Sequence, residues 1–183
     1  MTTSTISTNR SSLLKEAIQE RLPEYQALAL DIHQHPEVSN YEFYSSAALI
    51  RQLEKEGFTV EKEVAGHRTG FAASYRSDKP GPTIAFLAEF DALPGIGHAC
   101  GHNLFGTYSV LAASIIKKQI DEIGGEIRVY GTPGEEGGEN GSAKGSFVRE
   151  GLFDDVAAAL CAHPAYRYGK TTEALANDPG DIK

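Results

Sequence analysis

The chain has 183 residues, of which 40% are apolar and 23% are charged, and its formal net charge is −8 at pH 7. This length and composition are typical of one globular domain with a single core. No cluster of Lys and Arg offers a stripe for phosphate groups, and no apolar run approaches the roughly 20 residues that span a bilayer. These features argue against nucleic-acid binding and against membrane insertion.

The N-terminus and the cysteine content favour a reducing, cytoplasmic compartment. The first residues, MTTSTISTNRSS, are polar and do not contain the apolar segment of a secretory signal. The two cysteines, Cys100 and Cys161, are far apart in the sequence. A disulfide between them would conflict with the setting of Cys100, which is typical of a metal ligand.

The N-terminal third is predicted to be mostly helical. Residues 1–10 are expected to form a disordered tail ahead of the folded domain, residues 11–183. A helical pattern then runs from about Leu13 to His35 and contains a proline. The sequence Ser39-Asn40-Tyr41-Glu42 has the form of a capping box, so a second helix is expected to start there.

Strands and helices alternate through the rest of the chain. The pattern predicts a strand that begins near Phe58 and strands over Gly70–Arg76, Thr83–Ala88, Glu126–Tyr130 and Val156–Ala162. It also predicts a helix that Asn103 caps and that runs to about Ile123, and a short helix around Ser142–Glu150. The last strand is a continuous apolar run, which is typical of a buried strand. The alternation predicts an α/β fold of three layers, in which a sheet has helices on both faces.

Residues 97–102, Gly-His-Ala-Cys-Gly-His, form the most informative segment. Cysteine, histidine and carboxylate side chains bind borderline-soft divalent metals. Cys100 and His102 would point the same way from an extended loop, which Gly101 permits. The helix predicted after Asn103 would place the positive end of its dipole near Cys100 and favour a thiolate there.

Further candidate groups follow predicted strands. Glu135 and Glu136 are neighbours in a glycine-rich loop, so one can bind a metal while the other faces a bound water. His163 follows the last strand, and Asp91 follows the strand that ends at Ala88. Because open α/β sheets place their sites at the carboxyl ends of strands, we expect these groups to meet in the metal site of a hydrolase.

Each of these residues also has an ordinary structural explanation when it is considered alone. Buried cysteines and lone histidines are common, and an acidic pair in a glycine-rich loop is usually a solvated turn. The remaining candidates rank lower: His33 and His35, near a helix end, are structural or at most near the site, and a third ligand at His98 would crowd the metal. His67 is expected in a surface loop, and Cys161 is expected in the core.

Five motifs follow one another along the chain: His35-Pro36-Glu37, Asp91-Ala92-Leu93-Pro94, Gly97-His98-Ala99-Cys100-Gly101-His102, Glu135-Glu136 and Ala162-His163-Pro164. In this order they resemble the amidohydrolase branch of the dinuclear-metal aminoacylase and carboxypeptidase family. That branch includes hydrolases of indole-acetyl amino acids, aminobenzoyl-glutamate and other N-acyl amino acids. The resemblance, over about residues 25–183, implies a zinc-peptidase-like catalytic domain that cleaves small amides with two divalent metal ions, zinc or manganese.

The resemblance also implies roles for individual residues. It implies four metal ligands, Cys100, His102, Glu136 and His163. Cys100 would bridge the two metals, Glu135 would be the general base, and Asp91 would support the site. Glu89 stands where the carboxypeptidase branch has a histidine ligand, which favours the branch that uses cysteine. Asn103 replaces the aspartate that is common there and leans towards the aminobenzoyl-glutamate type.

Family members are longer than this chain. They carry an inserted lid or dimerisation domain and a final histidine ligand, so we expect residues 11–183 to be the N-terminal part of the catalytic domain. The crossing into the lid would begin at Asn177–Lys183, and the full-length form would be a homodimer. Two alternatives stay open, a non-catalytic metal-binding or interaction module and a structural zinc site. The spare carboxylate of Glu135 argues against the structural site.

Overall fold

A computed structural model of the protein describes residues 3–165, with side chains described from residue 11 onward. Within that range, five strands form one sheet in the order β1-β2-β4-β3-β5. The strands are β1 Thr59–Lys62, β2 Phe71–Arg76, β3 Thr83–Ala88, β4 Glu126–Gly131 and β5 Val156–Leu160. β3 is parallel to both β4 and β5, whereas β1 and β2 form the antiparallel part of the sheet. The carboxyl ends of the three parallel strands therefore lie at the same end of the sheet.

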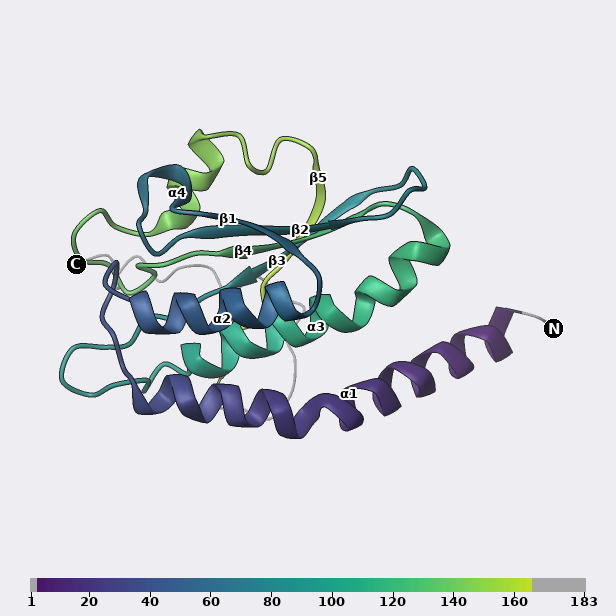
Figure 1. The fold of residues 1–183 in the computed structure, drawn as a ribbon, viewed down its shortest axis with the longest axis horizontal. Coiled ribbons are helices and arrows are strands. Elements are labelled where there is room, and N and C mark those ends of the chain that lie inside the picture. Colours follow the sequence, from purple (N-terminus) through teal and green to yellow (C-terminus); the bar gives the residue numbers. More distant parts are fainter. Residues whose placement is uncertain (1–2, 166–183) are drawn as a thin grey trace.

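Helices cover both faces of this sheet (Figure 1). The helices are α1 Thr3–Gln34, α2 Phe43–Lys55, α3 His102–Ile123 and α4 Ala143–Arg149, with a short 3-10 turn, η1, at Val64–Gly66. α1, α2 and α3 lie on one side of the sheet, and α4 lies on the other. The predicted layered α/β fold is confirmed. Among the described helices, none combines the length and the apolar character that a membrane span requires.

Two apolar clusters hold the layers together. The cluster on the side of α1–α3 is built around fully buried aromatic and aliphatic side chains, which include Ile32, Leu49, Phe71, Phe90 and Val110. The smaller cluster under α4 contains Val64, Leu87, Tyr130 and Phe147. Both clusters also include residues of β3 and β4, such as Phe86 and Val129 in the first and Leu87 and Tyr130 in the second. The core therefore fixes the starting points of the loops that follow these two strands.

The N-terminal helix differs from the prediction at its start. α1 begins at Thr3, so residues 3–10 continue the helix where a disordered tail was expected. The helix also continues through Pro23, and it bends without ending (Figure 1). Proline lacks the N–H that would complete the helical ladder, so a bend is its usual effect. The expected crossing at Asn177–Lys183 lies outside the described residues.

The predicted capping box does not form. Ser39 Oγ donates to Asp91 Oδ2 at 2.9 Å, and it does not cap α2. The free N–H groups in the first turn of α2 instead bond to Glu37. Its carboxylate accepts from the N–H groups of Tyr44 and Ser45, both at 2.9 Å. A carboxylate at this end of a helix also faces the positive end of its dipole.

The last strand is exposed, although its apolar run predicted burial. Among the described strands, β5 pairs only with β3 and lies at one edge of the sheet, and Ala157–Leu160 are open to solvent. Cys161, which was expected in the core, is exposed as well. An apolar run is typical of a buried strand, but the sequence does not show which strand lies at an edge.

Gly106 provides a test of how closely α3 packs on the sheet. A Cβ at this position would lie 2.7 Å from the carbonyl oxygen of Glu89, just after β3. We expect Gly106→Ala to lower the free energy of unfolding by roughly 1–3 kcal/mol, because the helix must move away from the strand. Thermal unfolding measures this loss.

The matched control is Gly145→Ala in α4, where a Cβ would come no closer than 3.4 Å to a flexible arginine end. Alanine favours the helix more than glycine does, so this variant should be as stable as the parent or more stable. Equal destabilisation by the two substitutions would contradict the close approach of α3 to β3.

Candidate metal centre

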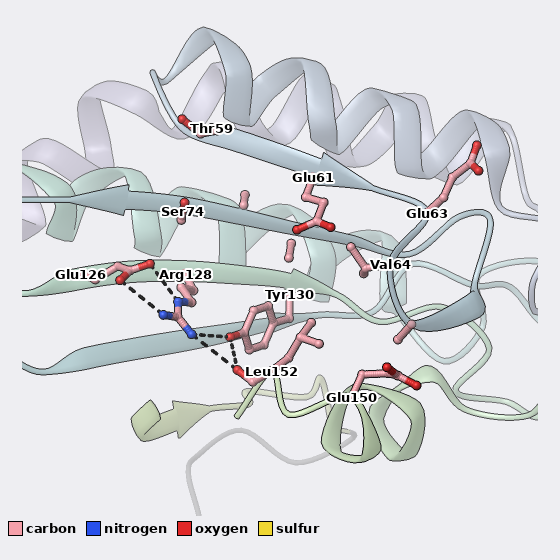
Figure 2. Close-up of a pocket in the computed structure, with 13 residues that line it drawn as sticks. Thr59, Glu61, Glu63, Val64, Ser74, Glu126, Arg128, Tyr130, Glu150 and Leu152 are labelled. Carbon is pink, nitrogen blue, oxygen red and sulfur yellow. Dashed lines mark hydrogen bonds and ion pairs between the residues drawn. The ribbon is translucent and has the colours of Figure 1, made fainter. Parts of the chain in front are cut away.

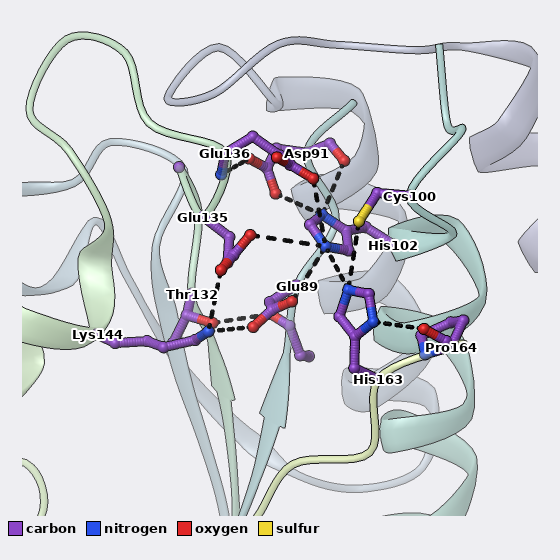
Figure 3. Close-up of polar contacts among 12 residues, drawn as sticks. Glu89, Asp91, Cys100, His102, Thr132, Glu135, Glu136, Lys144, His163 and Pro164 are labelled. Carbon is purple, nitrogen blue, oxygen red and sulfur yellow. Dashed lines mark hydrogen bonds and ion pairs between the residues drawn. The ribbon is translucent and has the colours of Figure 1, made fainter. Parts of the chain in front are cut away.

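The candidate ligands converge at the carboxyl ends of the three parallel strands (Figure 3). Asp91 follows β3, Glu135 and Glu136 follow β4, and His163 follows β5. His102 is the first residue of α3. The structure thus brings together residues that are up to 72 positions apart in the sequence, as the order of the strands predicted.

Cys100, His102 and His163 form the tightest group. Cys100 Sγ lies 3.3 Å from His163 Nε2, and His102 Nε2 lies 3.1 Å from the same nitrogen. All three ligand atoms lie within 4.8 Å of one another. Zinc binds sulfur at about 2.3 Å and imidazole nitrogen at about 2.0–2.1 Å, so these separations suit ligands that share one cation.

A sharp turn, and not an extended loop, brings Cys100 and His102 together. Gly101 has φ +86°, in the left-handed region that favours glycine, and it immediately precedes α3. A Cβ on Gly101 would also lie 3.1 Å from the ring of Pro164. The helix therefore starts at His102, before the predicted cap at Asn103. Asn103 does not cap it, and its side-chain amide donates to the carbonyl of Ala29 at 3.1 Å.

A second group consists of Glu89, His102 and Glu135, whose ligand atoms also lie within 4.8 Å of one another. Glu89 Oε2 is 3.1 Å from His102 Nε2 and is a buried oxygen with no hydrogen-bond partner among the described residues. An unpartnered buried carboxylate oxygen beside an imidazole nitrogen is a position that suits a cation. The donor set of the two groups, with sulfur, nitrogen and oxygen atoms, therefore fits divalent metal ions.

The two acidic residues of the loop border this cluster. Glu135 Oε2 and Glu136 Oε1 lie 3.9 Å and 4.0 Å from His102 Nε2. The side chain of Glu135 is 36% exposed, whereas that of Glu136 is 21% exposed and contacts the Cys100 thiol. Glu135 is therefore the more open of the two to water.

Asp91 links the imidazole to the acidic loop. Its fully buried carboxylate accepts from His102 Nδ1 at 2.8 Å through Oδ1 and from the Glu136 N–H at 2.9 Å through Oδ2. Because Nδ1 donates its proton to Asp91, Nε2 is the nitrogen left free for a metal. Burial alone would raise the pKa of Asp91, but the hydrogen bonds from His102 and Glu136 outweigh it and hold the pKa below its usual range.

The thiol of Cys100 is not predisposed to ionise. Burial, the hydrogen bond to Glu136 and the charges of Glu135 and Glu89 raise the pKa of Cys100 to about 12. The sequence predicted a thiolate favoured by the helix dipole, but burial, which has the largest effect, and the carboxylates of other segments favour the protonated thiol instead. A cation at the centre would reverse this balance, since it attracts the thiolate and offsets the carboxylates.

The sequence analysis missed two charged residues at the site. Glu89, which was used only to distinguish family branches, lies two positions before Asp91 at the end of β3 and is buried. Lys144 on α4 forms an ion pair with Glu89 and lies 4.0 Å from Glu135 Oε1. Burial would lower the pKa of Lys144, but its contact with Glu89 raises it. The spacing from Asp91 could have identified Glu89, whereas nothing local to α4 pointed to Lys144.

The other histidines lie outside these groups. His67 is buried, with 3% of its surface exposed, and bonds to Asn40 and Ser146, so the prediction of a surface loop residue was wrong. His35 is exposed and stacks on Tyr44, with ring centroids 4.1 Å apart, as a structural contact. His98 is buried beside His33 and belongs to neither ligand group.

One sizeable hollow among the described residues lies away from this centre. It has a volume of about 510 Å³ and lies over β1, β2 and β4 on the face that carries α4 (Figure 2). Arg128 crosses it and bonds to both carboxylate oxygens of Asp155 at 2.6 Å and to Glu126 at 2.8 Å. None of the candidate ligands lines this hollow. The charge of Arg128 is neutralised by its ion pairs with Asp155 and Glu126.

Comparisons with known proteins confirm the resemblance indicated by the motifs. A p-aminobenzoyl-glutamate hydrolase chain of Escherichia coli is 41% identical over 90% of this chain and 37% of its own length. Thermostable carboxypeptidase 2 of Saccharolobus solfataricus is 33% identical over 81% of this chain and 41% of its own length. No family model matches the chain.

The fold is shared with solved structures of the same kind. The YXEP protein of Bacillus subtilis, described as a dinuclear metal binding peptidase from the M20 family, superimposes with a TM-score of 0.66 and 26% identity. The match covers 75% of this chain and 41% of that one. The chain is thus similar over most of its length to amidohydrolases and peptidases of this dinuclear-metal family, and it spans about two fifths of the curated relatives named above.

Proposed function

We propose that this chain carries the metal-binding part of a metal-dependent amidohydrolase that cleaves the amide bond of N-acyl amino acids or related small amides. The observation that carries the proposal is the convergence of Cys100, His102 and His163 beside the partly exposed carboxylate of Glu135. A relative that hydrolyses p-aminobenzoyl-glutamate, as its name states, supports an amide of an amino acid as the substrate class.

The proposed ligands are Cys100, His102, Glu136 and His163. They would hold two divalent cations, and Cys100 would be shared between them. Zinc suits the thiolate, and manganese is the alternative. When bound, such ions polarise a carbonyl oxygen and lower the pKa of a coordinated water towards neutrality. Both cysteines are free, in keeping with the proposed reducing, cytoplasmic setting.

The side chains around the metals would position the substrate and transfer the proton of the attacking water. Glu135 is the proposed general base, which takes the proton of the attacking water and returns it to the leaving amine. Asp91 holds the His102 ring through Nδ1 and the Glu136 backbone through its N–H, so it orients one imidazole and one carboxylate together. A homodimer of the full-length form remains part of this proposal.

Metal analysis beside an amidase assay tests the proposal. The purified chain, stripped with a chelator and then incubated with zinc or manganese, should retain metal through gel filtration. Metal retained together with hydrolysis of an N-acyl amino acid or of aminobenzoyl-glutamate supports the enzyme. Metal retained without hydrolysis, also in a longer form of the protein, supports the non-catalytic metal-binding module. A chain that retains no metal would remove both.

A further inference from the structure

We propose that Asn40, Glu42 and the buried His67 are positioning residues that hold the Glu135–Glu136 loop against the metal centre. This inference rests on the proposed metal-binding function, because it concerns how two of the metal-site carboxylates are kept in place. None of the three residues belongs to the ligand groups, and all three are buried polar side chains.

Glu42 binds the start of the acidic loop. Its side chain is fully buried, and Oε1 accepts from the Gly134 N–H at 2.9 Å and from the Asn40 N–H at 2.7 Å. Its other oxygen accepts from Thr69 Oγ1 at 2.7 Å. Since Gly134 directly precedes Glu135, the Glu42 carboxylate fixes the backbone immediately before the proposed general base.

Asn40 binds the far end of the same loop. Its Nδ2 donates to the carbonyl oxygens of Glu139 and Gly141 at 2.7 Å and 3.1 Å. Its backbone is left-handed, with φ +63°, a conformation that asparagine tolerates better than most residues. A Cβ on Gly134 would lie 2.4 Å from this amide nitrogen, so the amide fits closely between the two ends of the loop.

His67 determines which way the Asn40 amide faces. His67 Nδ1 lies 2.7 Å from Asn40 Oδ1, which can only accept, so Nδ1 donates. His67 Nε2 then accepts from Ser146 Oγ at 3.0 Å, and that hydroxyl in turn accepts from Arg149 at 2.9 Å. Every member of this series of hydrogen bonds has a partner for its proton or lone pair. A satisfied buried network of this kind specifies a single arrangement of its side chains.

The loop needs this support because of its composition. Four of its glycines, Gly134, Gly137, Gly138 and Gly141, have positive φ, and glycine loses more conformational freedom on ordering than other residues do. Inside the loop, Glu136 is held to Asp91 through its N–H. Loss of the network should therefore release the loop carboxylates and leave Cys100, His102 and His163 in place, since those three come from other segments.

Binding of Co²⁺ alone to the metal-free chain tests the inference. Co²⁺ bound to a thiolate gives a charge-transfer absorption that reports Cys100, and titration gives the affinity. We expect Glu42→Ala to keep the thiolate absorption but to weaken Co²⁺ binding about 10- to 100-fold, the usual cost of losing support around a ligand. Glu42→Gln, whose amide can accept from both backbone N–H groups and donate to Thr69, should restore most of the affinity.

The matched control is Glu37→Ala. Glu37 is a carboxylate of the same segment, but its side chain bonds to the first turn of α2 and makes no hydrogen bond to the acidic loop among the described residues. The Glu37→Ala variant should have a lower thermal stability than the parent and the same Co²⁺ affinity. Equal Co²⁺ affinity in Glu42→Ala and Glu37→Ala would overturn the inference and make the network purely structural.

Asn40→Gly supplies a second variant if Glu42→Ala does not fold. Glycine accepts the left-handed backbone of Asn40, so only the amide bonds are lost, and the expected weakening of Co²⁺ binding is the same. Unchanged affinity in this variant would also overturn the inference. Failure of the unaltered chain to bind Co²⁺ has a different meaning, because it would remove the proposed metal-binding function itself.

Discussion

Replacement of Glu135 by glutamine should lower turnover of an N-acyl amino acid by roughly 10²- to 10⁴-fold, the usual contribution of a positioned general base. Glutamine has the shape of glutamate but cannot accept a proton at neutral pH. The Glu135 carboxylate is partly open to solvent, and it belongs to the group with Glu89 and His102 but not to that of Cys100, His102 and His163. The ion held by Cys100, His102 and His163 should therefore be retained in Glu135→Gln. Steady-state kinetics with metal analysis on the same samples measure both quantities, in whichever form of the protein hydrolyses the substrate.

The matched control for this variant is Glu139→Gln. Glu139 belongs to the same loop, and its side chain bonds only to the exposed hydroxyl of Tyr41 among the described contacts, at 3.1 Å. It should leave turnover within a few-fold of the parent. Retained turnover in Glu135→Gln would exclude Glu135 as the base, and loss of metal would show that Glu135 is a ligand.

The convergence of the site was predictable because it depends on chain order and strand direction. Asp91, the Glu135–Glu136 pair and His163 each follow a strand, and three parallel strands bring their ends to one edge of the sheet. Apolar runs in the sequence located these strands, including β5, which is apolar although the structure exposes it. The predicted strands therefore indicated that the candidate ligands would lie at one end of the sheet.

The environment of each residue was less predictable because it depends on partners far along the chain. His67 lies between Gly66 and Arg68, a local sequence typical of a surface loop, yet its partners are 27 and 79 positions away. Gly101 likewise packs against the ring of Pro164, which is 63 positions further along the chain. Local periodicity carries no information on such contacts, and the exposure of β5 depends likewise on its place in the strand order.

The protonation of Cys100 leads to the second large effect. Burial and neighbouring carboxylates raise its pKa to about 12, so the metal-free thiol keeps its proton at neutral pH and must lose it when a cation binds. Below that pKa, each pH unit of acidification makes the proton ten times harder to displace. The displacement of the Cys100 proton should therefore make zinc affinity fall about tenfold for each pH unit between pH 8 and pH 6. Calorimetry in buffers of different ionisation enthalpy counts the protons released.

Cys100→Ser should reduce zinc affinity by more than about 100-fold, beyond the cost of removing a residue that only supports a ligand. It should also release fewer protons on binding than the parent, because the serine hydroxyl is a poor ligand and holds its proton. Cys161→Ser is the matched control, since Cys161 is the exposed cysteine and lies outside both ligand groups. Its zinc affinity and proton count should equal those of the parent. An unchanged proton count in Cys100→Ser would show that the thiol does not bind the metal, and the shared-cation arrangement with His102 and His163 would then be wrong.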